Sequence, residues 1–245
     1  MSHDLKTKQI LNFLEQQAEA YPSLSGELAQ LSDLYTRKLW HQLTLLLQAV
    51  SQREGAAPLL QPLYETFVSD FKHKLNKLTL AQFQIAVARQ MPDSGQQAFF
   101  CKTAAEEASK DDRQASSYIL CELARMHLDA NQVADCKERL DEAAAFLESA
   151  AGIDTIVQAA YYRAKAAYYK LKGPAAEFYK HALLLLAYAP LSEVRPRPRC
   201  GSRARALVRR SCVARIARGA VHACTLAARW EAPCHMPLGS SLCRR

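Results

Sequence analysis

The chain has 245 residues, of which 49% are hydrophobic and 23% charged, and its formal net charge is +8. Residues 1–194 hold 20 Lys plus Arg against 23 Asp plus Glu, whereas residues 195–245 hold 12 Arg, one acid and no Lys. The net positive charge therefore belongs to residues 195–245, the tail. It does not indicate a nucleic-acid partner for residues 1–194, the body.

The sequence shows no pattern typical of a signal peptide or of a membrane-spanning segment. No run approaches 18 consecutive apolar residues, and the start lacks the basic patch and apolar core of a signal peptide. The body holds three cysteines, Cys101, Cys121 and Cys136, too few for a disulfide framework. We expect small buried thiols, a reducing intracellular compartment and no membrane span.

The first third of the body predicts helices separated by Pro and Gly. Residues 5–20 carry an apolar helical stripe that ends before Tyr21-Pro22, and helices are expected over 26–36 and 38–52. The stretch Gly55-Ala56-Ala57-Pro58 predicts a loop. A further helix over Leu59–Leu75 is expected to bury a ridge of residues at four-residue steps, namely Leu63, Phe67, Phe71 and Leu75.

Capping residues divide the rest of the body. Thr79-Leu80-Ala81-Gln82 is typical of a capping box, and the helix that it opens is expected to stop at Met91-Pro92. Asp93 or Ser94 is expected to cap a helix through Lys110, and Asp111 or Asp112 the next one. Helices over 132–150 and 154–172 follow, and Gly173-Pro174 separates the second from a last helix at 175–189. No segment alternates like a strand, so the body is predicted to be all-α.

Two helix pairs approximate a tetratricopeptide (TPR) pattern, in which small residues let paired helices approach closely. Tyr162, Ala166, Tyr169 and Gly173 meet the spacing of large, small, aromatic and glycine positions. A looser match runs through Leu120, Ala124, His127 and Asn131 and continues with Cys136, Leu140 and Ala143. The two turns lie 42 residues apart rather than 34, so the sequence predicts a stacked solenoid of irregular helix pairs. The alternative is a chance match to the pattern by helix hairpins that are rich in Ala and Tyr.

A family resemblance rests on the segment Leu34-Tyr35-Thr36-Arg37-Lys38-Leu39-Trp40-His41-Gln42-Leu43-Thr44-Leu45. It resembles the family of 26S proteasome non-ATPase regulatory subunit 13, whose members are lid subunits of the PCI class. Weaker similarity lies at 63–71, 87–91 and 179–183, and the likeness covers roughly residues 28–193. The residues that carry this family signature are Leu34, Tyr35, Lys38, Leu39, Trp40, His41 and Leu43.

The resemblance implies a non-catalytic scaffold that supports assembly for ubiquitin-dependent protein degradation. Such subunits have an amino-terminal fan of helix pairs, a winged-helix PCI module and a carboxy-terminal helix. Only the first matches here, so we expect a truncated chain with a helical-repeat domain at 1–193 and no winged helix. Other lid subunits are the expected partners, in the cytoplasm and nucleus, without a cofactor or small-molecule ligand.

The tail, residues 194–245, begins Val194-Arg195-Pro196-Arg197 and is rich in Arg, Ala and Cys. Electrostatics does not explain twelve Arg without one Lys, because phosphate contacts accept both residues. The mixture is typical of GC-rich DNA translated in a shifted frame or through an intron, and we expect no order in it. Its potential zinc ligands lack a close Cys pair, so no metal site is predicted from Cys200, Cys212, Cys224, Cys234, His235 and Cys243.

No motif in the body indicates an enzyme. The phosphate loop, the serine-nucleophile elbow and the zinc-helix motif are all absent. His41 lies beside Trp40 without a nucleophile or an orienting acid, so helix packing explains it better than catalysis. Tyr161-Tyr162 and Tyr168-Tyr169 form an aromatic ladder, which is typical of packing between helices. Where it is exposed, it is the candidate protein-contact patch.

Three functions compete. The first is the structural lid subunit, and the second is a subunit of another PCI assembly, such as the COP9 signalosome or a translation-initiation complex. The third is a nucleic-acid-binding adaptor that uses the Arg-rich tail, against which stands the lack of stacking aromatics other than Trp230. The Trp40 segment favours the proteasome.

Overall fold

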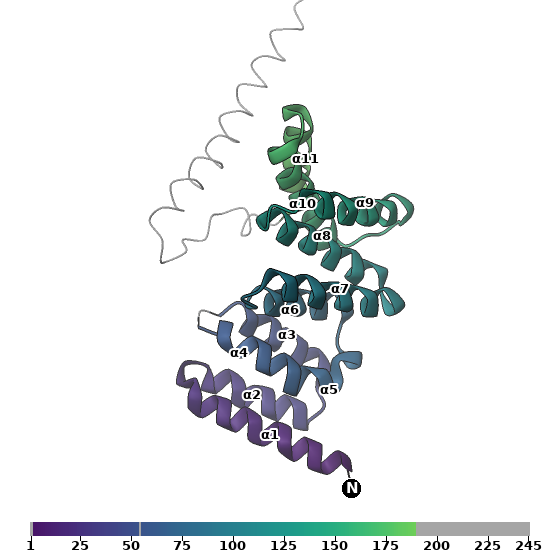
Figure 1. The fold of residues 1–245 in the computed structure, drawn as a ribbon. Coiled ribbons are helices and arrows are strands. Elements are labelled where there is room, and N and C mark those ends of the chain that lie inside the picture. Colours follow the sequence, from purple (N-terminus) through teal and green to yellow (C-terminus); the bar gives the residue numbers. More distant parts are fainter. Residues whose placement is uncertain (1, 54, 190–245) are drawn as a thin grey trace, which may run out of the picture. The chain divides into compact units, whose positions relative to one another are not determined.

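The computed structural model describes residues 2–53 and 55–189, and no strand occurs among them. The all-α prediction is confirmed for this part of the chain, which Figure 1 shows as a succession of helices. The elements are, in chain order, α1 (Ser2–Ala20), η1 (Pro22–Leu24), α2 (Ser25–Thr36), α3 (Trp40–Ser51), α4 (Ala57–Pro62), η2 (Leu63–Val68), α5 (Ser69–Phe71), η3 (Lys72–Lys74), α6 (Lys77–Ala88), α7 (Ser94–Asp111), α8 (Arg113–Asp129), α9 (Val133–Ser149), α10 (Thr155–Lys172) and α11 (Ala175–Tyr188).

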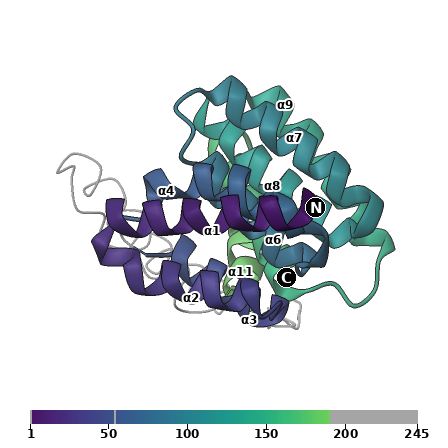
Figure 2. The ribbon, with the colours of Figure 1, turned by 90° about the horizontal axis from the view of Figure 1, so that it is seen from below.

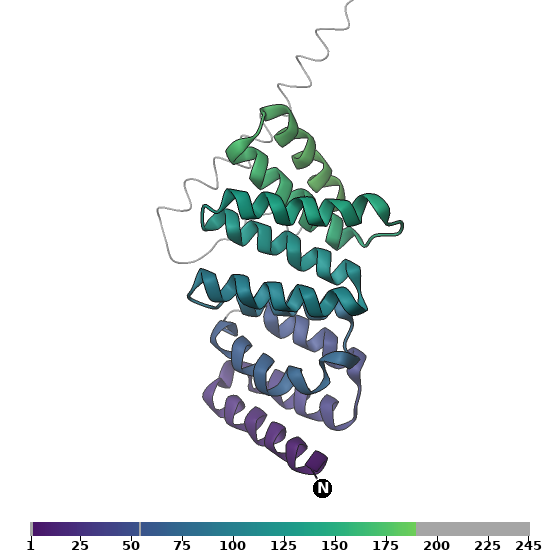
Figure 3. The same ribbon diagram turned by 45° about the vertical axis from the view of Figure 1, so that its right-hand side comes forward.

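These helices pack mainly on their neighbours in the chain. Helix α1 contacts α2, α2 contacts α3, and α3 contacts α6. From there α6 contacts α8 and α8 contacts α10, so these three helices form a row. Helices α7 and α9 pair with α8, and α11 pairs with α10. Figure 3 shows the resulting succession of layers, and Figure 2 looks along it from the α1 end. The arrangement is a stack of helix pairs, as the repeat spacing predicts.

Three apolar cores run through this stack. The first joins α1 to α6 through large side chains such as Leu31, Leu43 and Phe67. The second joins α6, α7 and α8, and the third joins α8, α9 and α10. The second and third cores are rich in Ala, which lets their helices approach closely.

The segment after Gly55 is helical but not regular. Ala57 and Pro58 belong to α4, so the predicted loop over Gly55–Pro58 is wrong in its second half. Pro58 fits the first turn of a helix, where its missing N–H would have no partner in any case.

The predicted helix over Leu59–Leu75 divides into α4, the π-helical η2, α5 and the 3-10 turn η3. All four ridge residues, Leu63, Phe67, Phe71 and Leu75, are buried as expected. Residues four apart drift by about 40° per step around an α-helix. A π-helix has more residues per turn and drifts the other way, so η2 helps to keep this ridge on one face.

Acidic side chains cap three helices, and two of them, Asp93 and Asp112, are predicted caps. The side chains of Asp93, Asp112 and Asp154 each accept a hydrogen bond from a backbone N–H in the first turn of α7, α8 and α10. The prediction that Thr79 opens a helix is wrong, because α6 begins at Lys77 and the side chain of Asn76 accepts from the N–H of Thr79.

Two helices end in turns with a left-handed residue other than glycine. Lys38 has φ 58° after α2, and Asn131 has φ 61° after α8. In the first turn the N–H of Leu39 donates to the carbonyl of Leu34 and that of Lys38 donates to Tyr35, which is the Schellman arrangement. Because of this turn, α3 begins at Trp40 rather than at the predicted residue 38.

The repeat positions behave as their sizes predict. Cys136, Leu140 and Ala143 are buried on the inner face of α9. A Cβ at Gly173 would lie 2.2 Å from Cδ1 of Tyr169, so only glycine fits between α10 and α11. The predicted domain boundary at 193/194 and the interpretations of the tail fall outside the described residues.

We expect Lys38→Gly to raise the free energy of unfolding by about 0.5–1 kcal/mol, because glycine adopts the left-handed conformation without a Cβ penalty. Urea unfolding followed by circular dichroism measures the effect. Gln42→Gly, at an exposed position inside α3, is the matched control and should lower stability by about 1 kcal/mol. A lower midpoint for Lys38→Gly would contradict the strain argument.

Candidate functional site

The seven signature residues lie at the joint between α2 and α3. Tyr35 and Leu43 are buried, Leu34, Leu39 and Trp40 are half-buried, and Lys38 and His41 are exposed. The joint is fixed by the Schellman turn, in which Leu34 and Leu39 are bonded through the backbone. His41 is exposed and has no catalytic geometry around it among the described residues.

An aromatic cluster holds this joint against η2 and α5. The ring of Tyr35 lies 5.4 Å from Phe67 and 5.6 Å from Phe71, and Trp40 stacks on Phe71 at 5.5 Å. Nζ of Lys74 lies 4.7 Å from the centre of the Trp40 ring, which is a cation–π contact. Aromatic pairs in these geometries add to the free energy gained by burial.

The Tyr35 hydroxyl donates a 2.9 Å hydrogen bond to Oδ2 of Asp70. Burial, together with this carboxylate, raises the pKa of Tyr35 to about 12, so the phenol stays protonated. The signature segment is thus an internal structural joint, and most of its side chains are committed to packing rather than presented to a partner.

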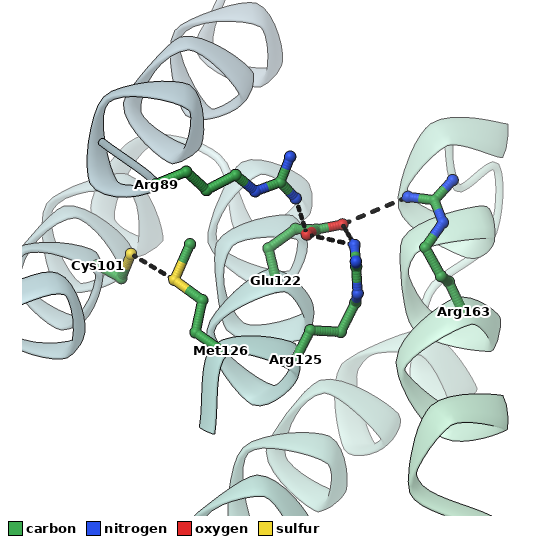
Figure 4. A network of polar contacts seen from close by, with 6 residues as sticks. All are labelled: Arg89, Cys101, Glu122, Arg125, Met126 and Arg163. Atoms are coloured by element: carbon green, nitrogen blue, oxygen red, sulfur yellow. Dashed lines mark hydrogen bonds and ion pairs between the residues drawn. The ribbon is translucent and has the colours of Figure 1, made fainter. Parts of the chain in front are cut away.

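A buried carboxylate forms the most connected polar site among the described residues. Glu122 on α8 is 1% exposed, and three arginines converge on it from α8, α10 and the residue after α6. Figure 4 shows Arg89, Arg125 and Arg163 around the carboxylate. Nη1 of Arg125 lies 2.9 Å from Oε2, Nη1 of Arg163 lies 3.4 Å from Oε1, and Nη2 of Arg89 donates to Oε2.

This arrangement keeps Glu122 charged. Burial alone would raise the pKa of its carboxyl, but Arg125, Arg89 and Arg163 together lower the pKa below its ordinary value. The residue patterns of the sequence did not predict this site. One signal was present, because Glu122 stands alone among apolar and small residues in Leu120-Cys121-Glu122-Leu123-Ala124.

The four tyrosines of the predicted contact patch lie on α10 and pack mainly between helices. Tyr161 is buried in the third core, and Tyr168 is half-buried against it. The rings of Tyr162 and Tyr169 stack on His181 of α11 at 6.0 and 5.2 Å, and Tyr162 also stacks on Tyr188. The structure brings the four together on one helix, and their contact with another protein stays a prediction.

A cavity of about 380 Å³ lies between the end of α9, α10 and α11. Its lining includes the stacked rings Tyr162, Tyr169 and His181 and the charged residues Glu148 and Lys165. Nε2 of His181 lies 3.4 Å from Glu177, and its Nδ1 is buried without a hydrogen-bond partner. Burial, with Lys165 nearby, lowers the pKa of His181, so the ring is neutral at pH 7.

Helix α11 also carries an apolar ridge that the described residues leave uncovered. Leu183 is 57% exposed, Leu186 is 43% exposed and Tyr179 is 40% exposed. The three are spaced by four and three residues and so lie on one helix face. We call these three residues the α11 face.

Within the described residues the structure offers no reactive centre. Cys101, Cys121 and Cys136 are free and buried, as expected, and burial raises the pKa of Cys101 and of Cys136 to about 12. Such thiols are poor nucleophiles at neutral pH. No group of three or more His, Cys, Asp or Glu is placed to hold a metal ion, and none of the described helices is long and apolar enough to cross a bilayer.

The charge on Glu122 makes stability depend on pH. Because its folded pKa is depressed, its contribution is fully present above the ordinary value of 4.5 and is lost as the pH falls through the folded pKa. We expect Glu122→Gln to lower the free energy of unfolding by about 1–3 kcal/mol at pH 7. The difference should shrink steadily below pH 4.5.

Urea unfolding at several pH values between 3 and 7 measures this difference. The matched control is Glu106→Gln, at an exposed position on α7, which should leave stability within about 0.5 kcal/mol of the original at every pH. A loss for Glu122→Gln that is independent of pH would contradict the assignment of a charged carboxylate.

Comparison with known proteins identifies the family. A model of the family described as PSD13 N-terminal repeats matches residues 27–208, which is most of the chain. The matched range starts within α2 and includes the signature segment, the Glu122 site and α11.

Curated relatives agree with this match. The chain is 36% identical over 191 residues to 26S proteasome non-ATPase regulatory subunit 13 homolog B of Arabidopsis thaliana, covering 75% of this chain and 49% of the relative. It is 36% identical over 197 residues to 26S proteasome non-ATPase regulatory subunit 13 of Dictyostelium discoideum, covering 78% and 50%. It is 28% identical over 183 residues to the probable 26S proteasome regulatory subunit rpn9 of Schizosaccharomyces pombe, covering 74% and 48%.

The chain therefore spans about half the length of the curated relatives that it matches. The matched half is the part that forms helical repeats, and both the signature segment and the fold agree with it. The chain belongs to the family of 26S proteasome non-ATPase regulatory subunit 13.

Proposed function

We propose that this chain is a non-catalytic structural subunit of the lid of the 26S proteasome regulatory particle. In that role it supports assembly for ubiquitin-dependent protein degradation, in the cytoplasm and nucleus, and its partners are other lid subunits. The observation that carries the proposal is the match of the family model over residues 27–208. The relatives' names describe them as non-ATPase regulatory subunits of the 26S proteasome.

The packing of the chain supports a scaffold role. In a solenoid each repeat buries its apolar surface on its neighbours, so an exposed apolar helix face needs a cover. The α11 face has no such cover among the described residues. Each large side chain left uncovered forgoes about 1.5–3 kcal/mol of burial. An uncovered ridge at the end of a stack is the expected feature of a protein that binds other proteins.

We propose no catalytic activity, cofactor or small-molecule ligand for the chain. Three buried thiols with raised pKa values and the lack of a metal-ligand group among the described residues support this. We place the function in the helical-repeat domain at 1–193. The family match runs on to residue 208, but we give residues 194–245 no role in the proposal, because twelve Arg without Lys is a composition that frame-shifted or intron-derived sequence explains best.

Affinity capture tests the proposal. The full chain is tagged, expressed in cultured eukaryotic cells and purified, and the recovered subunits are identified by mass spectrometry. Subunits of the 26S regulatory particle should be enriched over those of the COP9 signalosome and of translation-initiation complexes. Leu123→Arg, which places a charge in the second core, is the control and should abolish the enrichment.

Two outcomes would overturn the assignment. Recovery of signalosome or initiation-complex subunits without proteasome subunits would favour another PCI assembly. Recovery that disappears after ribonuclease treatment would favour a nucleic-acid adaptor that uses the Arg-rich tail.

The uncovered ridge predicts self-association of the purified chain. We expect the original protein to aggregate or to be degraded when no partner is present, and the double variant Leu183→Glu, Leu186→Lys to remain dispersed. The net charge is unchanged and both positions are exposed, so the melting temperature should stay within about 2 °C of the original.

Size-exclusion chromatography with light scattering at increasing concentration measures this behaviour. Phe99→Gln is the matched control, because Phe99 is a highly exposed apolar side chain on α7. It should aggregate as the original does. A monodisperse, protease-resistant monomer of the original chain would show that the α11 face needs no partner.

A further inference from the structure

The Glu122 site holds more positive charge than its carboxylate neutralises. Arg89 and Arg125 both pair with the Glu122 carboxylate and with no other carboxylate among the described residues, so these two side chains alone leave a local surplus of one positive charge. Glu122 is almost fully buried, but the side chains of Arg89, Arg125 and Arg163 are 48%, 32% and 28% exposed. The negative charge is therefore covered by the arginines, and the surplus charge faces outward.

The contacts within the site leave hydrogen-bond donors unused. Arg89 bonds Glu122 through Nη2 and Arg125 does so through Nη1, so the other nitrogens of each fork are available. Among the described residues, Glu122 is the carboxylate that pairs with Arg89 and Arg125, and no second one does. A guanidinium fork is shaped to hold a carboxylate by two parallel hydrogen bonds.

We propose that Arg89 and Arg125 bind a carboxylate side chain from an acidic segment of a partner protein. Glu122 holds the two forks in place from beneath, and the partner's carboxylate neutralises the charge that Glu122 leaves over. The surface spans the row of α6 and α8, so one acidic segment contacts two successive layers of the stack.

The charge of the rest of the body favours a protein over a nucleic acid as the partner. Residues 1–194 carry 20 basic and 23 acidic side chains, so the body has no net positive charge to follow the successive phosphates of a strand. Strong nucleic-acid binding needs several phosphate contacts, whereas two forks suffice for one carboxylate. This inference goes beyond lid membership and does not require it.

A labelled peptide of ten glutamates is the probe, and its fluorescence anisotropy is measured with the full chain at 50 mM NaCl. Arg89→Gln should weaken binding about tenfold, because the Glu122 charge remains covered by Arg125 and Arg163 while one fork is lost. Glu122→Gln should tighten binding severalfold, because it removes the competing carboxylate and raises the surplus positive charge of the site by one. A merely structural site would not give this gain.

Arg37→Gln is the matched control, with the same change of net charge at an exposed arginine that pairs with Asp33. It should leave peptide affinity unchanged within twofold, and the arginines of residues 195–245 are common to every variant. If Glu122→Gln does not keep its helical circular dichroism, Arg89→Lys replaces it as the second variant. Arg89→Lys keeps the charge without the fork and should weaken binding less than Arg89→Gln does.

Three results would overturn the proposal. One is an equal loss of peptide affinity in Arg89→Gln and Arg37→Gln, or no loss of affinity in either variant. Such a result would mean that the peptide binds elsewhere on the chain. Another is a folded Glu122→Gln variant that binds the peptide no more tightly than the original. The same holds for an Arg89→Lys variant that loses as much peptide affinity as Arg89→Gln does. The last is a ten-nucleotide single strand that binds more tightly than the peptide and depends on Arg89, because that would make the partner a nucleic acid.

Discussion

The fold depends on helices that must bury two opposite faces at once. Helix α6 gives Leu80, Phe83 and Val87 to the first core, and gives Ala81 and Ile85 to the second. Helix α8 likewise serves the second and third cores. No helix in this row can be stable by itself, because each obtains its burial from the layers before and after it. The α11 face stands out because no described residue covers it in this way.

In the interior of this row, a carboxylate is a costly residue to bury. Removing a charge from water is unfavourable unless partners replace its hydration, and Glu122 obtains them from three consecutive layers. Apolar packing is non-directional, whereas guanidinium–carboxylate bonds are satisfied in few orientations. The site therefore adds directional contacts between the layers of α6, α8 and α10, which apolar packing alone does not supply.

Much of this architecture could be predicted from the residues, because it rests on local chemistry. Acidic caps such as Asp112 and the buried ridge of Phe67 and Phe71 follow from spacing alone. The errors arose where tertiary contacts decide. Asn76 rather than Thr79 caps α6, and the widening of η2 depends on packing that no local pattern encodes. Glu122 was missed for the same reason, since two of its three arginines, Arg89 and Arg163, come from distant positions in the chain. The tyrosine ladder was recognised, but its contact with a partner has not been tested.

The aromatic joint between α2 and α3 has an optical consequence. Trp40 is the single indole among the described residues, and the other tryptophan of the chain is Trp230. It stacks on Phe71 beneath the ammonium group of Lys74, so its emission reports whether η2 and α5 are seated against α3. With Trp230 replaced by phenylalanine, a single fluorophore would register loosening of the amino-terminal layers separately from events around α10 and α11.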